Sequence, residues 1–189
     1  MSTGGKTSLI TLRNSSGSSM TLTDYGARIV SINVPDRNGK LDDVVVGYGD
    51  IESFEKGKER FMGCVIGRFG NRIDGASFCI DGQRYDVVAN EQFDGQPVQC
   101  HGGFQGFDRF VWEYELLNEE NRAGVRFHRL SPDGEEGFPG NCDCYVTYCW
   151  TNDNVCQIEY RATTDKTTVI TLSNHTYFNM TGDFSKNAL

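Results

Sequence analysis

Residues 77–88 have the sequence Ser-Phe-Cys-Ile-Asp-Gly-Gln-Arg-Tyr-Asp-Val-Val. Two segments rich in strand-forming residues, 77–80 and 83–88, are joined by Asp81-Gly82. This dipeptide suits a two-residue hairpin turn, because both turn positions need a positive φ. The stretch therefore predicts a β-hairpin, and it sets the pattern for the rest of the chain.

Similar segments recur along the chain and are separated by Gly, Asp and Asn, which is typical of antiparallel β structure. Helical periodicity is nearly absent: only Asp50 to Lys56 resembles a helical turn, with Asp50 as its N-cap. No repeat is detectable, which argues against solenoids and propellers. We therefore predict an all-β fold, a large antiparallel β-sandwich. The other strands expected are residues 8–13, 28–34, 41–46, 111–117, 124–130, 143–151, 155–163 and 168–173.

The composition is that of one globular domain: 189 residues, of which 38% are apolar and 23% charged. The net charge of −8 is spread along the chain, which disfavours nucleic acid and anionic membranes as partners. Uncharged or cationic ligands fit this charge better. No run of apolar residues has membrane-spanning length, and the first residues do not resemble an export signal, so we expect a cytosolic protein.

Seven cysteines without an export signal indicate reduced thiols. Cys142 and Cys144 alternate within a predicted strand, so they share one face with Val146, Tyr148 and Trp150. A metal site is the alternative, but no second cysteine pair stands at zinc-finger spacing. We expect packing thiols, no metal and no cofactor.

The three histidines stand in different surroundings. His101 precedes two glycines, Gly102 and Gly103, which allow unusual dihedrals or close approach to a ligand. His175 follows the apolar segment 169–172, so it emerges at a strand end, whereas His128 alternates with Phe127 inside a strand. An imidazole can give or take a proton near neutral pH, so His101 and His175 are candidates for acid–base chemistry. The alternative is a structural role, since a histidine at a strand end, taken singly, is more often a hydrogen-bonded structural residue than a catalyst.

Residues 67–73, Gly-Arg-Phe-Gly-Asn-Arg-Ile, form a glycine-rich loop that matches neither nucleotide-binding fingerprint. Its planar donors, on Arg68, Asn71 and Arg72, suit neighbouring hydroxyl groups such as those of a sugar. Alternatively, Arg72 pairs with a carboxylate and Asn71 closes a turn. In a second loop, residues 131–140, Glu135 and Glu136 could line a cleft; we favour solvated loop acids.

Taken together and in order, these segments resemble the galactose mutarotase (aldose 1-epimerase) family, from about residue 25 to residue 182. The matching stretches are Gly70 to Ile73, Tyr85 to Asn90, His101-Gly-Gly with Gly106 to Asp108 and Trp112, Ser131 to Asn141, Thr164 to Thr167, and Asn174 to Asn179.

The resemblance implies a mutarotase-like sandwich and an isomerase that interconverts the α and β anomers of aldohexoses such as galactose or glucose. It implies that His175 is the general acid for the ring oxygen and that His101 is the second catalytic histidine. Asn71 and Arg72 match substrate-binding positions, and Phe107 is a further candidate to face the sugar. Such chemistry needs no cofactor.

In that family the general base is a glutamate near the end of the fold. We therefore expect the base beyond Leu189, and a single domain, residues 1–189, that is incomplete at its C-terminus. Strand edges left open would favour self-association unless a missing C-terminal half covers them. A non-catalytic carbohydrate-binding or sensing domain of the same fold, or an inactive fragment, is the alternative.

Overall fold

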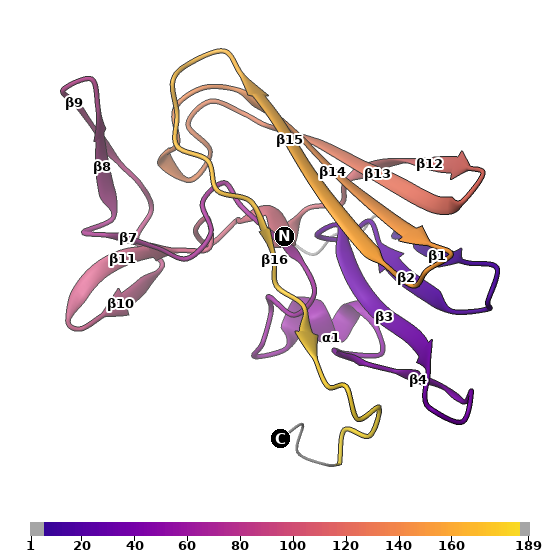
Figure 1. Ribbon diagram of the computed structural model, residues 1–189. Coiled ribbons are helices and arrows are strands. Elements are labelled where there is room, and N and C mark those ends of the chain that lie inside the picture. Colours follow the sequence, from indigo (N-terminus) through magenta and orange to yellow (C-terminus); the bar gives the residue numbers. More distant parts are fainter. Residues whose placement is uncertain (1–5, 186–189) are drawn as a thin grey trace.

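The computed structural model describes residues 6–185, and two four-stranded antiparallel sheets dominate it (Figure 1). The first sheet has the order β1-β2-β3-β4 and the second the order β12-β13-β14-β15. The predicted all-β antiparallel sandwich is confirmed. The strands of the two sheets are β1 (Leu9–Arg13), β2 (Ser19–Thr23), β3 (Arg28–Pro35), β4 (Leu41–Asp43), β12 (Glu113–Glu119), β13 (Arg122–Ser131), β14 (Cys142–Thr151) and β15 (Cys156–Thr164).

The main apolar core lies between these two sheets. Strand β2 contributes Met20 and Leu22, and β13 contributes Val125 and Phe127, each with no exposed surface. Strand β14 buries every second residue from Cys142 to Trp150, so the predicted packing face of the cysteines is confirmed. The two sheets thus bury the apolar face that each strand pattern provides.

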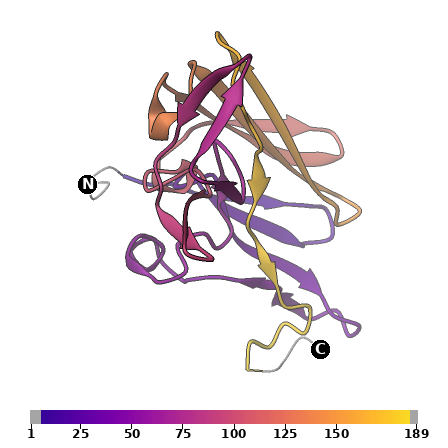
Figure 2. The ribbon, with the colours of Figure 1, turned by 90° about the vertical axis from the view of Figure 1, so that its left-hand side faces the viewer.

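A second group of strands stands apart from the sandwich as two hairpins, which face the viewer in Figure 2. The hairpin of β8 and β9 follows the sequence prediction: Asp81 and Gly82 have φ of 50° and 81°. Strands β10, β11 and β7 form a three-stranded sheet in a region that the sequence suggested was largely loop. The bounds are β7 (Arg72–Asp74), β8 (Ser77–Ile80), β9 (Gln83–Asp86), β10 (Glu91–Phe93) and β11 (Gln96–Cys100).

Very short strand pairs connect the two parts. Strand β16 (Ser173–Asn174) pairs with β6 (Val65–Ile66), and β17 (Tyr177–Phe178) pairs with β5 (Val45–Val46). The predicted strand 168–173 is therefore wrong except at its last residue, since residues 168–172 make only an isolated bridge with Phe69.

Within residues 6–185, helical structure is limited to three short elements: α1 (Ile51–Lys56), η1 (Phe107–Arg109) and η2 (Glu135–Gly137). The predicted cap of α1 is confirmed, because the Asp50 carboxylate accepts a hydrogen bond from the Ser53 amide at 2.7 Å. Among residues 6–185, no helix is long and apolar enough to cross a membrane.

Candidate active site

Two of the three histidines, 74 positions apart in the sequence, meet at what we call the histidine corner, formed by residues 61–72, 101–108 and 173–177. The imidazole rings of His101 and His175 have centroids 5.1 Å apart and are nearly perpendicular, at 88°. The ring of Phe61 packs against both, at 4.8 Å and 5.9 Å, and Tyr177 lies 5.1 Å from His175. No sequence pattern pointed to Phe61 as a residue of the site.

His175 directly follows β16, and backbone contacts hold it on both sides. Its amide donates to the carbonyl of Cys64 at 2.8 Å, and its carbonyl accepts from the amide of Gly63 at 2.9 Å. The neighbouring Asn174 side chain donates to the Gly63 carbonyl at 2.9 Å and to the Tyr148 hydroxyl at 3.1 Å. His175 thus follows a strand end, but that strand is β16 and not the predicted segment 169–172. Asn174 anchors this end to the sandwich.

His101 lies in a backbone conformation that few residues adopt. Its φ is 52°, and Gly102 and Gly103 follow with φ of 85° and 97°. A side chain on Gly102 would overlap the carbonyl oxygen of Gly67, so the chains cross there too closely for a Cβ. The predicted need for glycine at both positions is confirmed.

The hydrogen bonds of His101 define its tautomer. The backbone amide of Asn71 donates to Nδ1 of His101 at 3.0 Å. The backbone amide of His101 in turn donates to the backbone carbonyl of Asn71 at 3.0 Å. Burial, the neighbouring His175 and the charge of Arg72 lower the pKa of His101 to about 4. The ring is therefore neutral near pH 7, with its proton on Nε2, and it can donate one hydrogen bond from that atom.

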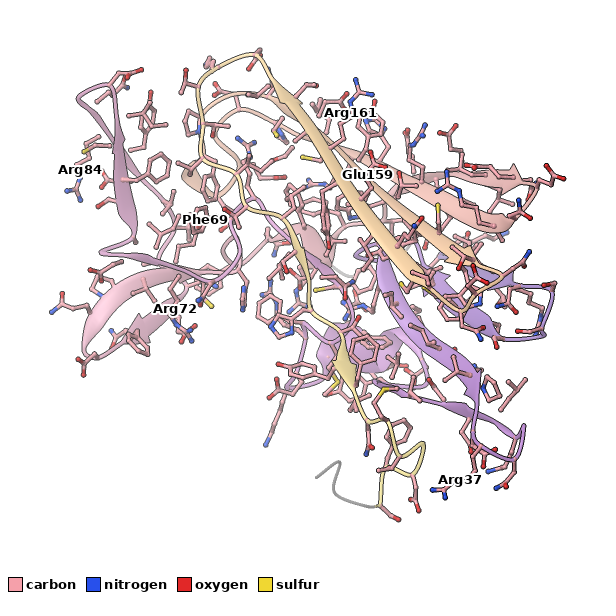
Figure 3. All side chains as sticks on the ribbon, viewed as in Figure 1. Arg37, Phe69, Arg72, Arg84, Glu159 and Arg161 are labelled. Carbon is pink, nitrogen blue, oxygen red and sulfur yellow. The ribbon has the colours of Figure 1, made fainter. Side chains whose placement is uncertain are left out.

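Asn71 and Arg72 are exposed beside the two histidines, and Figure 3 shows Arg72 on β7 next to the β10–β11 hairpin. Arg72 forms an ion pair with Glu91 at 2.6 Å and donates to the side-chain oxygen of Asn71 at 3.2 Å. The alternative that Arg72 pairs with a carboxylate is thus confirmed. Both residues also line a pocket of about 570 Å³, which is bordered by the exposed ring of Phe93.

The segment from residue 8 to residue 189 matches the family model described as aldose 1-epimerase. The chain belongs to the aldose 1-epimerase family. It is 39% identical to the galactose mutarotase of Rattus norvegicus over 164 residues, which cover 87% of this chain and 45% of that protein. It is 37% identical to the aldose 1-epimerase of Escherichia coli (strain K12) over 177 residues, or 94% of this chain and 49% of that protein. The chain thus spans about half the length of the curated relatives it matches.

Solved structures of aldose 1-epimerase relatives have the same fold. An aldose epimerase homologue from C. elegans superposes with a TM-score of 0.81 at 32% identity, over 92% of this chain and 51% of that one. A galactose 1-epimerase from Lactobacillus acidophilus gives a TM-score of 0.78 at 24% identity, over 92% of this chain and 53% of that one, and shows the likeness of fold alone.

Two residues that the sequence analysis placed near a sugar lie inside the molecule: Phe107, suggested by the family resemblance, and Arg68, suggested by the donors of the 67–73 loop. Phe107 is 1% exposed and packs edge-on against Trp112 at 5.6 Å, beneath Gly67. It thus supports the corner from the core, and its ring has almost no exposed surface to offer a sugar. Arg68 is 2% exposed and donates to the carbonyls of Pro139 and Gly140 at 2.8 Å and 2.9 Å. Its guanidinium holds a loop, so the sugar-binding interpretation of Arg68 is wrong.

Glu135 and Glu136 are bonded to protein groups rather than freely solvated, so the expectation of solvated loop acids is wrong for both. Glu135 forms a two-pronged ion pair with Arg129, with distances of 2.7 Å and 3.0 Å. Glu136 accepts hydrogen bonds from the amides of Phe104 and Gln105. The buried guanidinium of Arg129 needs a partner of opposite charge. Its pairing with Glu135 therefore outweighs the tendency of loop carboxylates to remain hydrated.

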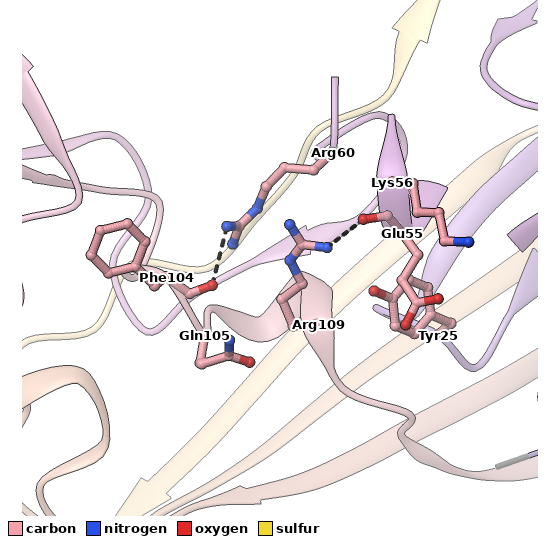
Figure 4. Close-up of a pocket in the computed structure, with 7 residues that line it drawn as sticks. All are labelled: Tyr25, Glu55, Lys56, Arg60, Phe104, Gln105 and Arg109. Carbon is pink, nitrogen blue, oxygen red and sulfur yellow. Dashed lines mark hydrogen bonds between the residues drawn. The ribbon is translucent and has the colours of Figure 1, made fainter. Parts of the chain in front are cut away.

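A pocket of about 440 Å³ near the corner contains no histidine (Figure 4). Two of the arginines on its wall are already bonded: Arg60 donates to the Phe104 carbonyl and Arg109 to the Glu55 carbonyl. Its chemistry does not match an acid–base site. The residues that line it are Tyr25, Glu55, Lys56, Arg60, Phe104, Gln105 and Arg109.

Proposed function

We propose that this chain supplies the acid side of an aldose 1-epimerase that acts on aldohexoses such as galactose or glucose. The observation that carries the proposal is the perpendicular pair of His101 and His175, with ring centroids 5.1 Å apart and exposed planar donors beside it. Membership of the aldose 1-epimerase family supports the same reaction.

His175 acts as the general acid. A base removes the proton from the anomeric hydroxyl while His175 gives a proton to the ring oxygen, and the bond between C1 and the ring oxygen breaks. The open-chain aldehyde then rotates about its bond to C2. Reclosure on the other face reverses both proton transfers and gives the other anomer, so no oxidant, reductant or cofactor is consumed.

His101 acts as a neutral hydrogen-bond donor rather than as a proton-transfer group. Its Nδ1 is occupied by the Asn71 amide, so Nε2–H is the atom free to point at a sugar oxygen. Arg72 and Asn71 bind further hydroxyl groups, and the Glu91 carboxylate holds the guanidinium in place for this task.

The base is proposed to be a carboxylate outside residues 1–189. The acidic groups whose charge acts on His101 are Glu91 and Asp108. Glu91 is paired with Arg72, and the buried Asp108 is paired with Arg60 at 2.8 Å. Both carboxylates are thus engaged with arginine. The chain also covers only about half of its curated relatives, which leaves room for the base elsewhere in the protein.

Polarimetry of freshly dissolved α-galactose with the full-length protein tests this proposal. His175→Ala is expected to lower kcat/KM by roughly 10²- to 10⁴-fold, because a positioned general acid contributes about that much to the rate. His128→Ala is the matched control, since His128 lies on the outer side of β13 and pairs with Asp143. Its activity should equal that of the wild type.

Equal rates in wild type and His175→Ala would remove His175 from the acid role. Sugar binding by the wild-type protein without any acceleration of mutarotation would instead favour the carbohydrate-binding alternative. Binding is measured separately, by titration calorimetry with galactose.

A further inference from the structure

The loop that carries His101 needs an external restraint. Three consecutive residues, His101 to Gly103, have positive φ, a conformation that costs free energy at a non-glycine position. The loop continues through Phe104 and Gln105, which are both exposed. Local sequence preference therefore does not keep the His101 ring in place, and the surrounding structure has to do so.

The Glu136 side chain provides a two-point contact with this loop. One carboxylate oxygen accepts from the Phe104 amide at 3.0 Å and the other from the Gln105 amide at 3.1 Å. A Cβ on Gly103 would overlap the same carboxylate, so the loop backbone lies directly against it. Hydrogen bonds to a charged acceptor are stronger than those to a neutral one, and both oxygens of the Glu136 carboxylate accept such a bond.

Glu136 is itself held firmly. Its backbone has a φ of 50°, and its carbonyl accepts from the Val88 amide at 3.0 Å and from the side chain of Gln99 at 3.1 Å. The buried Arg68 holds the ends of the 131–140 loop, through the carbonyls of Ser131 and Gly140 at 3.0 Å and 2.9 Å. The carboxylate thus projects from a rigid support.

The remaining contacts of the loop act on other atoms. Asn71 pairs with His101 itself, and Arg60 donates to the carbonyls of Gly103 and Phe104 at 3.3 Å and 3.1 Å. These bonds do not involve the backbone amides of Phe104 and Gln105, which donate to the Glu136 carboxylate instead. Loss of that carboxylate would free the loop on the side opposite Asn71.

We propose that Glu136 is a positioning residue whose carboxylate fixes the 101–105 loop, so that Nε2–H of His101 faces the sugar. The inference rests on the proposed sugar-binding role of His101. A glutamine at this position keeps the length but offers only one acceptor oxygen, and its amide group would face an N–H donor. An alanine removes both contacts.

NMR titration of the three histidine rings in the full-length protein tests the positioning role. Glu136→Ala should raise the pKa of His101 by at least about one unit from about 4 toward its ordinary value near 6.5, because hydration of a released loop removes the burial that lowers it. Removing a nearby negative charge would by itself lower that pKa, so a rise reports movement of the loop. The titration of His128 should not change.

The kinetic expectation follows from the same movement. Glu136→Ala should lower kcat/KM about 10- to 100-fold, since displacement of a catalytic group by about 1 Å can cost that much. Glu136→Gln should fall between alanine and wild type in both measurements. Asp36→Ala is the matched control: Asp36 also accepts from two backbone amides, of Asn38 and Lys40, but in the turn between β3 and β4.

An unchanged His101 titration in folded Glu136→Ala would overturn the proposal, whatever happens to thermal stability. The same holds if Asp36→Ala shifts His101 as much. If the alanine variant does not fold, Glu136→Gln decides alone, and a wild-type His101 titration in it counts against the proposal. The titration needs no turnover, so absence of epimerase activity in the wild type would refute the proposed function without preventing this test.

Discussion

The sandwich and the histidine corner are stabilised in different ways. Between the two large sheets, many similar apolar side chains share the burial, with backbone ladders running along every strand. In the corner, individual polar groups carry the structure: Arg68, Glu136 and Asn174 each hold a different loop or strand end. The ladders of the corner are two residues long at β6 and β16.

The difference indicates where a single substitution acts locally and where it acts globally. A truncated apolar side chain in the sandwich removes packing that every strand shares, so the whole domain loses stability. A lost polar partner in the corner leaves specific donors or acceptors unpaired, and the damage concentrates on the loops they hold. Site geometry can therefore be lost at a modest cost in global stability.

The largest stability effect is expected in the sandwich. Phe127 has no exposed surface and packs against Tyr148 on the neighbouring strand β14, with ring centroids 5.9 Å apart. Phe127→Ala should lower the free energy of unfolding by about 3 to 5 kcal/mol, because it leaves a cavity as well as losing apolar burial. Urea denaturation of the full-length protein measures the change.

Leu116→Ala is the matched control on the same sheet, since Leu116 is on the neighbouring strand β12 and 59% exposed. It should alter the free energy of unfolding by less than about 0.5 kcal/mol. Leu116 pairs directly with the buried Val125, so it lies on the same face as Phe127 but at the β12 edge of the sheet. Comparable losses in both variants would mean that this edge is as buried in the full-length protein as the neighbouring strand, and the contrast with the corner would need revision.

The next effect is expected at the support of the corner. Arg68→Met keeps much of the buried volume but removes the donors to Ser131, Pro139 and Gly140. The unpaired buried acceptors should cost about 1 to 3 kcal/mol. The bonds that Arg68 donates hold the loop that carries Glu136. Amide hydrogen exchange should therefore increase most in residues 131–140 and 101–105.

Arg37→Met is the control for loss of a guanidinium, because Arg37 is exposed in the turn after β3 (Figure 3). Its free energy of unfolding should stay within about 0.5 kcal/mol of wild type. If exchange in Arg68→Met rises uniformly over the sandwich instead, Arg68 belongs to the shared core and not to a separate support of the corner.

The strands of the sandwich and of the β8–β9 hairpin could be predicted well because the information that specifies them is local. The Asp81-Gly82 turn has the φ values that its residue types favour, and β14 buries the alternating residues that its pattern indicates. Segment 168–172 shows the limit of this reasoning: it is rich in β-branched residues but lacks a paired neighbour, so it does not form a strand.

The site could be predicted only in part. His101, His175 and Asn71 stood out by residue type and glycine context, but their contact depends on pairings such as β16 with β6, which no local pattern encodes. Glu136 was misjudged because a carboxylate pair in a Gly/Pro loop has the same sequence signature whether it meets water or two backbone amides. Only the fold brings residues 104 and 136 together.

The pH dependence of stability also separates the two regions. In the corner, burial first and then the neighbouring His175 lower the pKa of His101 to about 4, below the value near 6.5 of the unfolded chain. Between these values the unfolded chain binds more protons, so His101 lowers stability as the pH falls from about 6.5 toward 4. His101→Asn should therefore reduce the loss of folding stability as the pH falls from about 6.5 toward 4. Asparagine tolerates the positive φ at this position.

On the sandwich, His128 should have the opposite sign. Burial lowers its pKa, but hydrogen bonds to Asp143 and Glu113 outweigh burial and raise it. A raised value means that the charged ring stabilises the fold at low pH and that this contribution is lost as the pH rises through the folded-state pKa. His128→Asn should thus remove a decline in folding stability above about pH 6.5. It should leave the loss of stability between about pH 6.5 and 4 unchanged. Urea denaturation at a series of pH values measures both slopes, and slopes that change in the same direction in both variants would show that the two histidines are held alike.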